Sequence, residues 1–365
     1  LIYKMAIIKD IIKTNDRLYR LSSQISELSE ELNIPSFLVG GCVRDLLIDP
    51  SIDSVDIDIM VEGNAIDYAK KLAKTLGVKT IVPFPEFATA RIPYDECEIE
   101  VASARLESYD SKSRKPKSVD MTDVISDLKR RDFTVNAIAI SLSKDNFGEL
   151  IDPFDGLQHL KSKILKTPDN PDETFSEDPL RMVRAAYFAS KLSMDIDKEC
   201  LQSLKKNADR IKIVSQERIT NELLKILNTA SPSIGLILLE ENGLLEYIFP
   251  EIHIMYGLDQ TSEWHHKDIF FHTMEVVDNA AKLSKKVNLR LAALVHDIGK
   301  PKTRRLHKEK GYTFYGHDDL GSRMLEEVSK RMKFSNKTKD YIKKLTLLHL
   351  RPISLAKKDV TDSAI

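Results

Sequence analysis

Two carboxylates early in the chain have a spacing suited to metal binding. Asp56 and Asp58 alternate with apolar residues, which predicts a β-strand. The buried face of this strand would carry Val55, Ile57 and Ile59, and the other face both carboxylates. Like charges held together repel, but Mg²⁺ prefers hard oxygen ligands of this kind. The pair therefore predicts a magnesium site, although an Asp-x-Asp spacing alone is common.

A glycine pair lies just upstream of the carboxylates. Gly40 and Gly41 follow a short apolar segment, and Arg44 lies on the helix predicted to begin after them. Glycines let the backbone approach a ligand, and the N–H groups at a helix N-terminus bind phosphate. A tight turn without a ligand explains the same glycines equally well, so the chemistry depends on the combination with the carboxylates.

These segments together resemble a known family. The glycine pair followed by the two aspartates is similar to the nucleotidyltransferase signature of the polymerase β superfamily. Residues 130–137 resemble the RRDFTxNA motif of class II CCA-adding enzymes and bacterial poly(A) polymerases. The resemblance implies a polymerase β-like α/β (α+β) nucleotidyltransferase head, followed by an all-α neck and body, and phosphoryl transfer assisted by two Mg²⁺ ions.

The resemblance also implies roles for individual residues. Glu98 and Glu100 share one face of a second predicted strand, and Glu100 matches the position of the third carboxylate in the family. The catalytic residues, of which the first two are expected to hold Mg²⁺, are Asp56, Asp58 and Glu100. The expected nucleotide-binding residues are Gly40, Gly41, Arg44, Arg130, Arg131, Asp132, Asn136, Asp178, Arg181 and Arg184. The two adjacent arginines suit a triphosphate or RNA, and the Asp and Asn that follow suit a ribose.

Base selection is expected at the start of a helix that follows Pro179. Asp178 and Arg181 lie three residues apart on one helix face, and the family match implies that they act as a protein template for the incoming base. Cytosine and adenine both present an amine donor beside a ring-nitrogen acceptor, which Asp and Arg complement, whereas uracil and guanine invert this pattern. A surface ion pair is the alternative interpretation.

Several other segments match the family. Arg184 could stack on the base or contact phosphate, and Arg218 is expected to pair with Glu222 and brace a helix. The polar segment after Arg105 is predicted to be a flexible loop that helps the switch from C to A. Its candidate residues are Arg105 and Glu107, followed by the basic run Lys112, Arg114, Lys115 and Lys117. Residues around Asp152 and Gly156 are interpreted as a structural connector.

Histidines concentrate in the last third of the chain. His272 and the pair His296-Asp297, followed by Ile-Gly-Lys, resemble the HD metal-phosphohydrolase superfamily. Such ligands suit a transition metal such as Mn, Ni or Zn. His317 and His349 are secondary candidates, with core or surface histidines as the alternative. The last Asp ligand of the superfamily is expected beyond residue 365, or at Asp362.

The elements that must position these residues change type along the chain. Residues 17–33 have helical spacing, residues 36–165 alternate between β-rich and helical segments, and amphipathic helices dominate afterwards. We expect a nucleotidyltransferase head at 1–165, a helical neck and body at 166–260, and a helical HD domain at 261–365 that is incomplete at its C-terminus.

Composition sets limits on the partners. The formal net charge of −1 over 365 residues provides no global positive field, so RNA contact must come from local basic patches. The three cysteines have no metal-ligand spacing, and no apolar run approaches the length of a membrane span. These features predict a cytoplasmic protein without a membrane partner.

The predicted function is template-independent addition of CCA to the 3′ end of tRNA, with CTP and ATP as substrates. A poly(A) polymerase, or an enzyme that adds only A or only CC, shares the same motifs. From another class, an HD phosphohydrolase with an RNA-binding head is the alternative. The sequence leaves the oligomeric state open.

Overall fold

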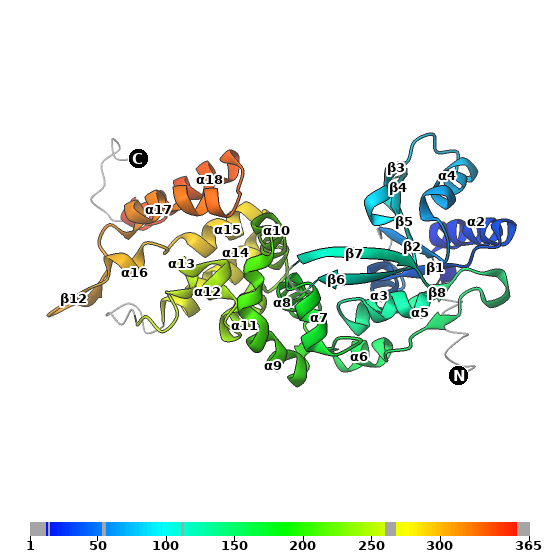
Figure 1. Cartoon of the computed structure of the whole chain (residues 1–365). Helices are drawn as coiled ribbons and strands as arrows, with labels where there is room; N and C mark the ends of the chain where they lie inside the picture. The colour runs from blue at the N-terminus through cyan, green and yellow to red at the C-terminus, as the bar shows by residue number, and fades with distance from the viewer. Residues whose placement is uncertain are drawn as a thin grey trace. The chain divides into compact units, whose positions relative to one another are not determined.

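The computed structural model describes residues 12–13, 15–52, 56–95, 97–110, 113–259 and 268–355. The chain forms two compact units, Leu1–Glu177 and Asp178–Ile365 (Figure 1). The first combines a mixed β-sheet with helices, and the second is almost entirely helical, as predicted. None of the described helices combines the length and apolarity that a membrane crossing requires.

A seven-stranded sheet organises the first unit. Its spatial order is β3 (Val82–Phe84), β4 (Thr89–Tyr94), β5 (Cys97–Ser103), β2 (Ile57–Val61), β1 (Ser36–Val39), β8 (Ala139–Ser141) and β9 (Leu150–Ile151). Strands β2 and β5 are parallel, and the other neighbours are antiparallel. The helices are α2 (Asp16–Leu32), α3 (Gly41–Ile48), α4 (Ala65–Thr75), α5 (Val124–Lys129), α6 (Gly156–Ser162) and α7 (Pro171–Glu177).

The two faces of this sheet differ because side chains alternate along each strand. Ile57 and Ile59 of β2 are buried in a large core with residues of α2 and α4 such as Ile25 and Leu72. The opposite face carries a smaller core that includes Met60, and Asp58 lies on this second face. The predicted division of β2 into an apolar and an acidic face is confirmed for the described residues; Val55 lies outside them.

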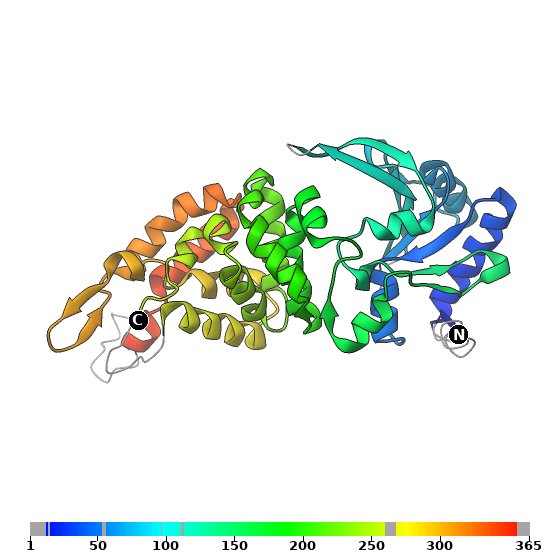
Figure 2. The ribbon, with the colours of Figure 1, turned by 60° about the horizontal axis from the view of Figure 1, so that its bottom comes forward.

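The second unit is built from packed helices (Figure 2). They are α8 (Leu180–Leu192), α9 (Lys198–Asn207), α10 (Gln216–Leu227), α11 (Pro232–Glu241), α12 (Leu245–Ile248), α13 (Pro250–His253), α14 (Ile269–Leu283), α15 (Val287–Val295), α16 (Lys300–Thr303), α17 (His317–Arg331), α18 (Asn336–Leu348) and α19 (Arg351–Leu355). Buried Arg290 of α15 donates to the carbonyl oxygens of Leu227 and Thr229 at 2.8 and 2.7 Å. These two hydrogen bonds join the end of α10 to α15, the helix that directly precedes His296.

Candidate active site and histidine centre

The predicted catalytic carboxylates lie on neighbouring strands. In the parallel pairing of β2 with β5, Asp58 stands directly opposite Glu100, and Asp56 immediately precedes β2. Burial, together with the negative charges of Glu100 and Asp56, raises the pKa of Asp58 to about 6, although Arg131 opposes this effect. The sheet therefore concentrates negative charge at one place. A divalent cation with oxygen ligands would relieve that repulsion.

Glu100 is held by an arginine that the sequence analysis did not identify. Arg91 of β4 stands opposite Glu100 in the register, and its Nε lies 2.9 Å from Glu100 Oε2. Its Nη1 lies 3.6 Å from Glu98 Oε2. In the described part of the chain, the ligand atoms of Asp56, Asp58 and Glu100 are not all within 4.8 Å of one another. A metal shared by all three carboxylates would therefore require a side chain to change its rotamer.

The glycine turn brings an arginine to the carboxylates. Gly40 has φ of 70°, and a Cβ built on it would lie 2.9 Å from Arg131 Nη1 and 3.5 Å from Asp58 Oδ2. Only glycine allows both this backbone conformation and this close approach without strain. Helix α3 begins directly afterwards at Gly41, so its first N–H groups start next to Asp58. The predicted glycine, carboxylate and arginine residues thus come together.

Arg44 belongs to a buried polar network. Its Nη1 donates to Asn136 Oδ1 at 2.5 Å, and Asn136 Nδ2 donates to Asp132 Oδ1 at 3.0 Å. A second guanidinium nitrogen lies 2.8 Å from Asp45 Oδ1. The family motif at 130–137 is therefore tied to the helix that follows the glycine turn. The network fixes the positions of Asp132 and Asn136, and their ribose contact stays a prediction.

One buried carboxylate orients both arginines of the motif. Asp127, 1% exposed, lies 2.6 Å from Arg130 Nη2 through Oδ1 and 3.1 Å from Arg131 Nη2 through Oδ2. Burial alone would raise the pKa of Asp127, but the two guanidinium groups outweigh it and hold the pKa below its usual value. The sequence analysis missed Asp127. The spacing of three and four residues on α5 could have indicated it.

The segment predicted as a flexible loop is instead a β-hairpin. Strands β6 (Arg105–Asp110) and β7 (Ser113–Met121) pair antiparallel, with Glu107 opposite Val119. At the base of the hairpin, the side chain of Arg105 donates to the Phe87 carbonyl. Of the predicted basic run, Lys112 lies outside the described residues. The loop prediction was wrong because the mostly polar composition gave no strand signal, whereas the pairing depends on backbone hydrogen bonds between the two strands.

The connector is structural. Asp152 accepts hydrogen bonds from the backbone N–H groups of Gly156 and Leu157 at 2.6 and 2.9 Å, so it caps the start of α6. Gly156 packs directly on the chain of the motif, since an added Cβ would lie 2.3 Å from the carbonyl oxygen of Thr134. The two residues therefore hold α6 against the segment that carries Asn136.

Replacing Gly156 by Ala should destabilise the first unit. The new methyl group must displace backbone atoms, and such overpacking costs about 3 kcal/mol. Thermal unfolding followed by circular dichroism would measure the change. Gln158→Ala, an exposed change on the same helix, is the control and should alter stability by no more than about 0.5 kcal/mol. Equal effects of the two substitutions would contradict the packing argument.

The base-recognition candidates lie at the start of the second unit. Asp178 Oδ1 accepts from the Leu180 N–H at 3.2 Å, and Arg181 follows in the first turn of α8. Arg218 of α10 holds the Asp178 carboxylate, with its Nη2 2.8 Å from Oδ2 and its Nη1 3.4 Å from Oδ1. The carboxylate therefore has a fixed orientation at the start of α8.

The predicted pairing of Arg218 with Glu222 is wrong. Arg218 binds Asp178, and buried Glu222 instead lies 2.7 Å from Lys225 Nζ and 3.9 Å from Arg184 Nη1. The guanidinium of Arg184 also lies 5.2 Å from the centre of the Phe188 ring. The spacing of one helical turn favoured the incorrect pair, whereas the actual partner, Asp178, precedes α8 and is 40 residues away in the sequence.

Five residues converge in the histidine centre. Asp297 is buried, and its Oδ2 lies 3.0 Å from His296 Nε2 and 3.7 Å from His272 Nε2. Its Oδ1 lies 3.3 Å from His317 Nε2 and 3.7 Å from His349 Nε2. Two groups able to hold a metal ion therefore share Asp297, and both secondary candidates from the sequence belong to one of them. Asp362 lies outside the described residues.

The histidine rings are oriented for metal binding. Nδ1 of His296, His317 and His349 each lies within 2.6–2.8 Å of the carbonyl oxygen three residues earlier. When Nδ1 carries the proton and donates to that carbonyl, Nε2 presents its lone pair toward Asp297, as a metal ligand requires. Burial, with His296 and His317 nearby, lowers the pKa of His349 and favours the neutral ring. The donor set thus fits a transition metal.

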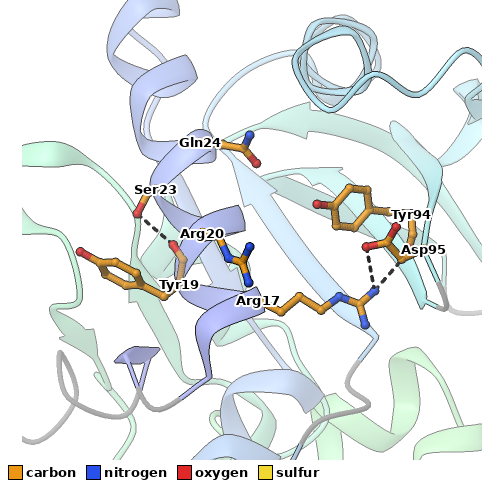
Figure 3. A pocket seen from close by; sticks show the side chains of 7 residues that line it. All are labelled: Arg17, Tyr19, Arg20, Ser23, Gln24, Tyr94 and Asp95. Atoms are coloured by element: carbon orange, nitrogen blue, oxygen red, sulfur yellow. Dashed lines mark hydrogen bonds and ion pairs between the residues drawn. The ribbon is translucent and has the colours of Figure 1, made fainter.

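A separate cavity of about 590 Å³ lies beside α2, and Asp56, Asp58 and Glu100 are not among its lining residues (Figure 3). Arg17 crosses it, and its Nη2 donates to the Tyr94 carbonyl at 3.3 Å and to Cys97 Sγ at 3.2 Å. The same nitrogen lies 3.9 Å from Asp95 Oδ2. These contacts tie α2 to the turn between β4 and β5, which is a structural role.

Three segments of the chain match known protein families. Residues 36–166 match the poly A polymerase head domain, residues 193–255 the probable RNA and SrmB-binding site of polymerase A, and residues 269–365 the HD domain. The chain is 35% identical over 315 residues to the multifunctional CCA protein of Psychromonas ingrahamii, covering 83% of this chain and 72% of that protein. It is 36% identical over 239 residues to the A-adding tRNA nucleotidyltransferase of Aquifex aeolicus, covering 63% of this chain and 28% of that protein.

Solved structures show the same fold. A complex of a CCA-adding enzyme with CTP is similar with a TM-score of 0.69 and 25% identity, covering 98% of this chain and 80% of that one. The domain order, the relatives and the structural neighbours agree with one another. The chain therefore belongs to the family of class II CCA-adding tRNA nucleotidyltransferases and bacterial poly(A) polymerases, and it carries a C-terminal HD domain.

Proposed function

We propose that this protein adds C, C and A to the 3′ end of tRNA, using CTP and ATP and no nucleic acid template. The observation that carries the proposal is the meeting of Asp58, Glu100, Gly40 and Arg131 around one concentration of negative charge. Further support comes from the multifunctional CCA protein named above and from CCA-adding enzymes solved with ATP and with CTP.

The residues divide the work of nucleotidyl transfer. Asp56, Asp58 and Glu100 would hold two Mg²⁺ ions, which supply charge stabilisation at the attacking and leaving oxygens. Arg131 and the first N–H groups of α3 bind the triphosphate and orient its α-phosphate toward the tRNA 3′ hydroxyl. The attack forms a new phosphodiester bond and releases pyrophosphate. Asp132 and Asn136, fixed by their network, hydrogen-bond the ribose.

Base selection belongs to Asp178 and Arg181. The carboxylate accepts from the exocyclic amine shared by cytosine and adenine, and the guanidinium donates to the adjacent ring nitrogen. Arg218 acts as a positioning residue, since it fixes the carboxylate in one orientation. Uracil and guanine would place a carbonyl against that carboxylate and leave buried polar groups unpaired.

The test is pyrophosphate release and product length with a tRNA transcript that lacks CCA, in the presence of Mg²⁺, CTP and ATP. The proposal expects three added nucleotides per tRNA and three pyrophosphates released, with no reaction in EDTA. A folded protein that leaves this transcript unextended would contradict it.

A second activity, a metal-dependent phosphohydrolase, is proposed for the HD centre because five ligand-type side chains converge there. His272, His296 and Asp297 would hold Mn, Ni or Zn.

In this proposal the chain divides into a head at 1–165, a neck and body at 166–260 and an HD domain at 261–365. Because the proposed substrate of the head is tRNA, we propose a cytoplasmic location.

Replacing His296 by Ala should lower the metal content of the second unit. Removing a residue that only orients a metal ligand already weakens metal binding by about 10–100-fold, so loss of a ligand nitrogen should weaken it at least as much. Elemental analysis after dialysis against Ni²⁺ or Mn²⁺ would measure the loss, and tRNA extension should continue unchanged. His253→Ala, which removes a histidine that bonds Glu240 outside the centre, is the control and should retain metal. Equal metal content in both variants would contradict the assignment.

A further inference from the structure

A basic β-hairpin projects from the second unit beside the histidine centre. Strands β12 (Arg305–His307) and β13 (Gly311–Thr313) pair antiparallel, and the hairpin stands clear of the helices of its unit (orange in Figures 1 and 2). All of β12 is exposed, and Leu306 and Tyr315 are each 75% exposed. β13, by contrast, is half-buried, so β12 forms the more exposed edge of the hairpin.

The charge of the hairpin is strongly one-sided. Residues 300–315 contain six Lys or Arg residues and one acidic residue, Glu309. Lys300 pairs with Asp297, and the other five form no ion pair with any described residue. These five are Lys302, Arg304, Arg305, Lys308 and Lys310. A cluster of cations without acidic partners creates a positive local potential, which attracts a polyanion.

The base of the hairpin contacts residues of the histidine centre. Nδ1 of His317 lies 2.7 Å from the carbonyl oxygen of Phe314, and Lys300 Nζ lies 2.7 Å from Asp297 Oδ2 and 5.4 Å from the centre of the Phe314 ring. Gly299 allows this packing, since a Cβ there would lie 2.1 Å from the His317 carbonyl oxygen. A ligand bound along the hairpin would therefore reach the histidine centre at the base of the hairpin, close to Asp297.

We propose that the β12–β13 hairpin is an RNA-binding finger that holds a single-stranded phosphodiester backbone next to the HD centre. Lysine and arginine bind phosphates, and exposed Tyr315 offers a flat surface for a base. Arg304, stacked 3.6 Å from the centre of the Tyr312 ring, stiffens the base of the finger. The choice of RNA over another polyanion rests on the proposed function in tRNA maturation.

The test compares two triple variants of the full chain. R305Q/K308Q/K310Q neutralises the finger, and K282Q/K285Q/K330Q removes the same charge from exposed sites elsewhere in the unit. Fluorescence anisotropy would measure the Kd for a labelled 12-nucleotide single-stranded RNA at several salt concentrations. No nucleoside triphosphate is present, so the result does not depend on whether the chain adds CCA. Circular dichroism confirms that both variants fold.

The finger variant should raise Kd about tenfold or more, and it should lower the slope of log Kd against log salt by about 2, since each phosphate contact on a single strand contributes about 0.7. Affinity for cytidine monophosphate should not change, because one nucleotide cannot span the three side chains. Equal Kd and slope in the two variants would overturn the proposal. Hairpin-dependent binding of polyglutamate with unchanged RNA binding would also overturn it and assign an acidic protein partner.

Discussion

Asp58→Asn is expected to lower the rate of nucleotide addition by about 10³-fold or more while making the protein more stable. The substitution keeps the shape of the side chain but removes a negative ligand, and metal stabilisation of the transition state is worth several kcal/mol. Single-turnover extension of tRNA would measure the loss.

The gain in stability follows from the raised pKa of Asp58. The folded-state pKa of this carboxyl group lies above its unfolded value, so stability is lost as the pH rises from the unfolded pKa of 3.8 to the folded pKa of about 6. Above pH 6 the loss is complete, because the folded protein must then hold the ionised carboxylate in a buried, negatively charged place. Without metal at pH 7.5, the neutral amide should therefore raise the free energy of unfolding by about 1–3 kcal/mol. A variant that is inactive but less stable than the original protein would contradict this account of the carboxylate cluster.

The two glutamates of β5 provide the matched control. Glu98→Gln should leave nucleotide addition within about threefold of normal, because Glu98 is 60% exposed and pairs only with Arg91 in the described structure. Glu100→Gln should behave like Asp58→Asn, since Glu100 stands opposite Asp58. The reverse order of effects would move the third metal ligand to Glu98.

Asp178→Ala is expected to abolish most of the discrimination between CTP and UTP. Hydrogen-bond-based sites reject wrong substrates by up to about 10⁴-fold, and without the carboxylate the carbonyl of uracil no longer meets a repulsive partner. The ratio of kcat/KM for CTP to that for UTP, measured on a tRNA lacking CCA, should fall by at least about 10²-fold. An unchanged ratio would assign base recognition to other residues.

Arg218→Gln should reproduce part of this loss. The variant keeps Asp178 but releases its orientation, so KM for CTP should rise and selectivity should fall, while kcat changes less. Arg218→Lys should restore part of the selectivity, because an ammonium group retains one contact. Lys198→Gln, an exposed change of the same charge in the same unit, should alter none of these values.

Local patterns were enough to predict part of the fold and to name candidate site residues. Strand alternation placed Asp58 and Ile59 on opposite faces, and the helix expected at 17–33 is α2. The glycine turn and the histidines were recognisable because their chemistry restricts residue type. The register that sets Glu100 opposite Asp58 agrees with the choice made from the family position.

The contacts that orient these residues were harder to predict. Arg218 reaches Asp178 across 40 residues of sequence, and Arg91 meets Glu100 only through the antiparallel register of β4 and β5. Neither contact leaves a periodic signal in the sequence. The hairpin of β6 and β7 was missed for a similar reason, because its stability depends on strand pairing and its sequence is mostly polar, without a regular apolar alternation.

The most direct test of the central proposal uses three tRNA transcripts that end before CCA, after C and after CC, each supplied with Mg²⁺ and with the four nucleotides singly and together. The account predicts addition of C, C and A to the first, C and A to the second, and A alone to the third, after which extension stops. Growth of an unlimited A tail, or addition of A alone to the third transcript with no C added to the others, would contradict it.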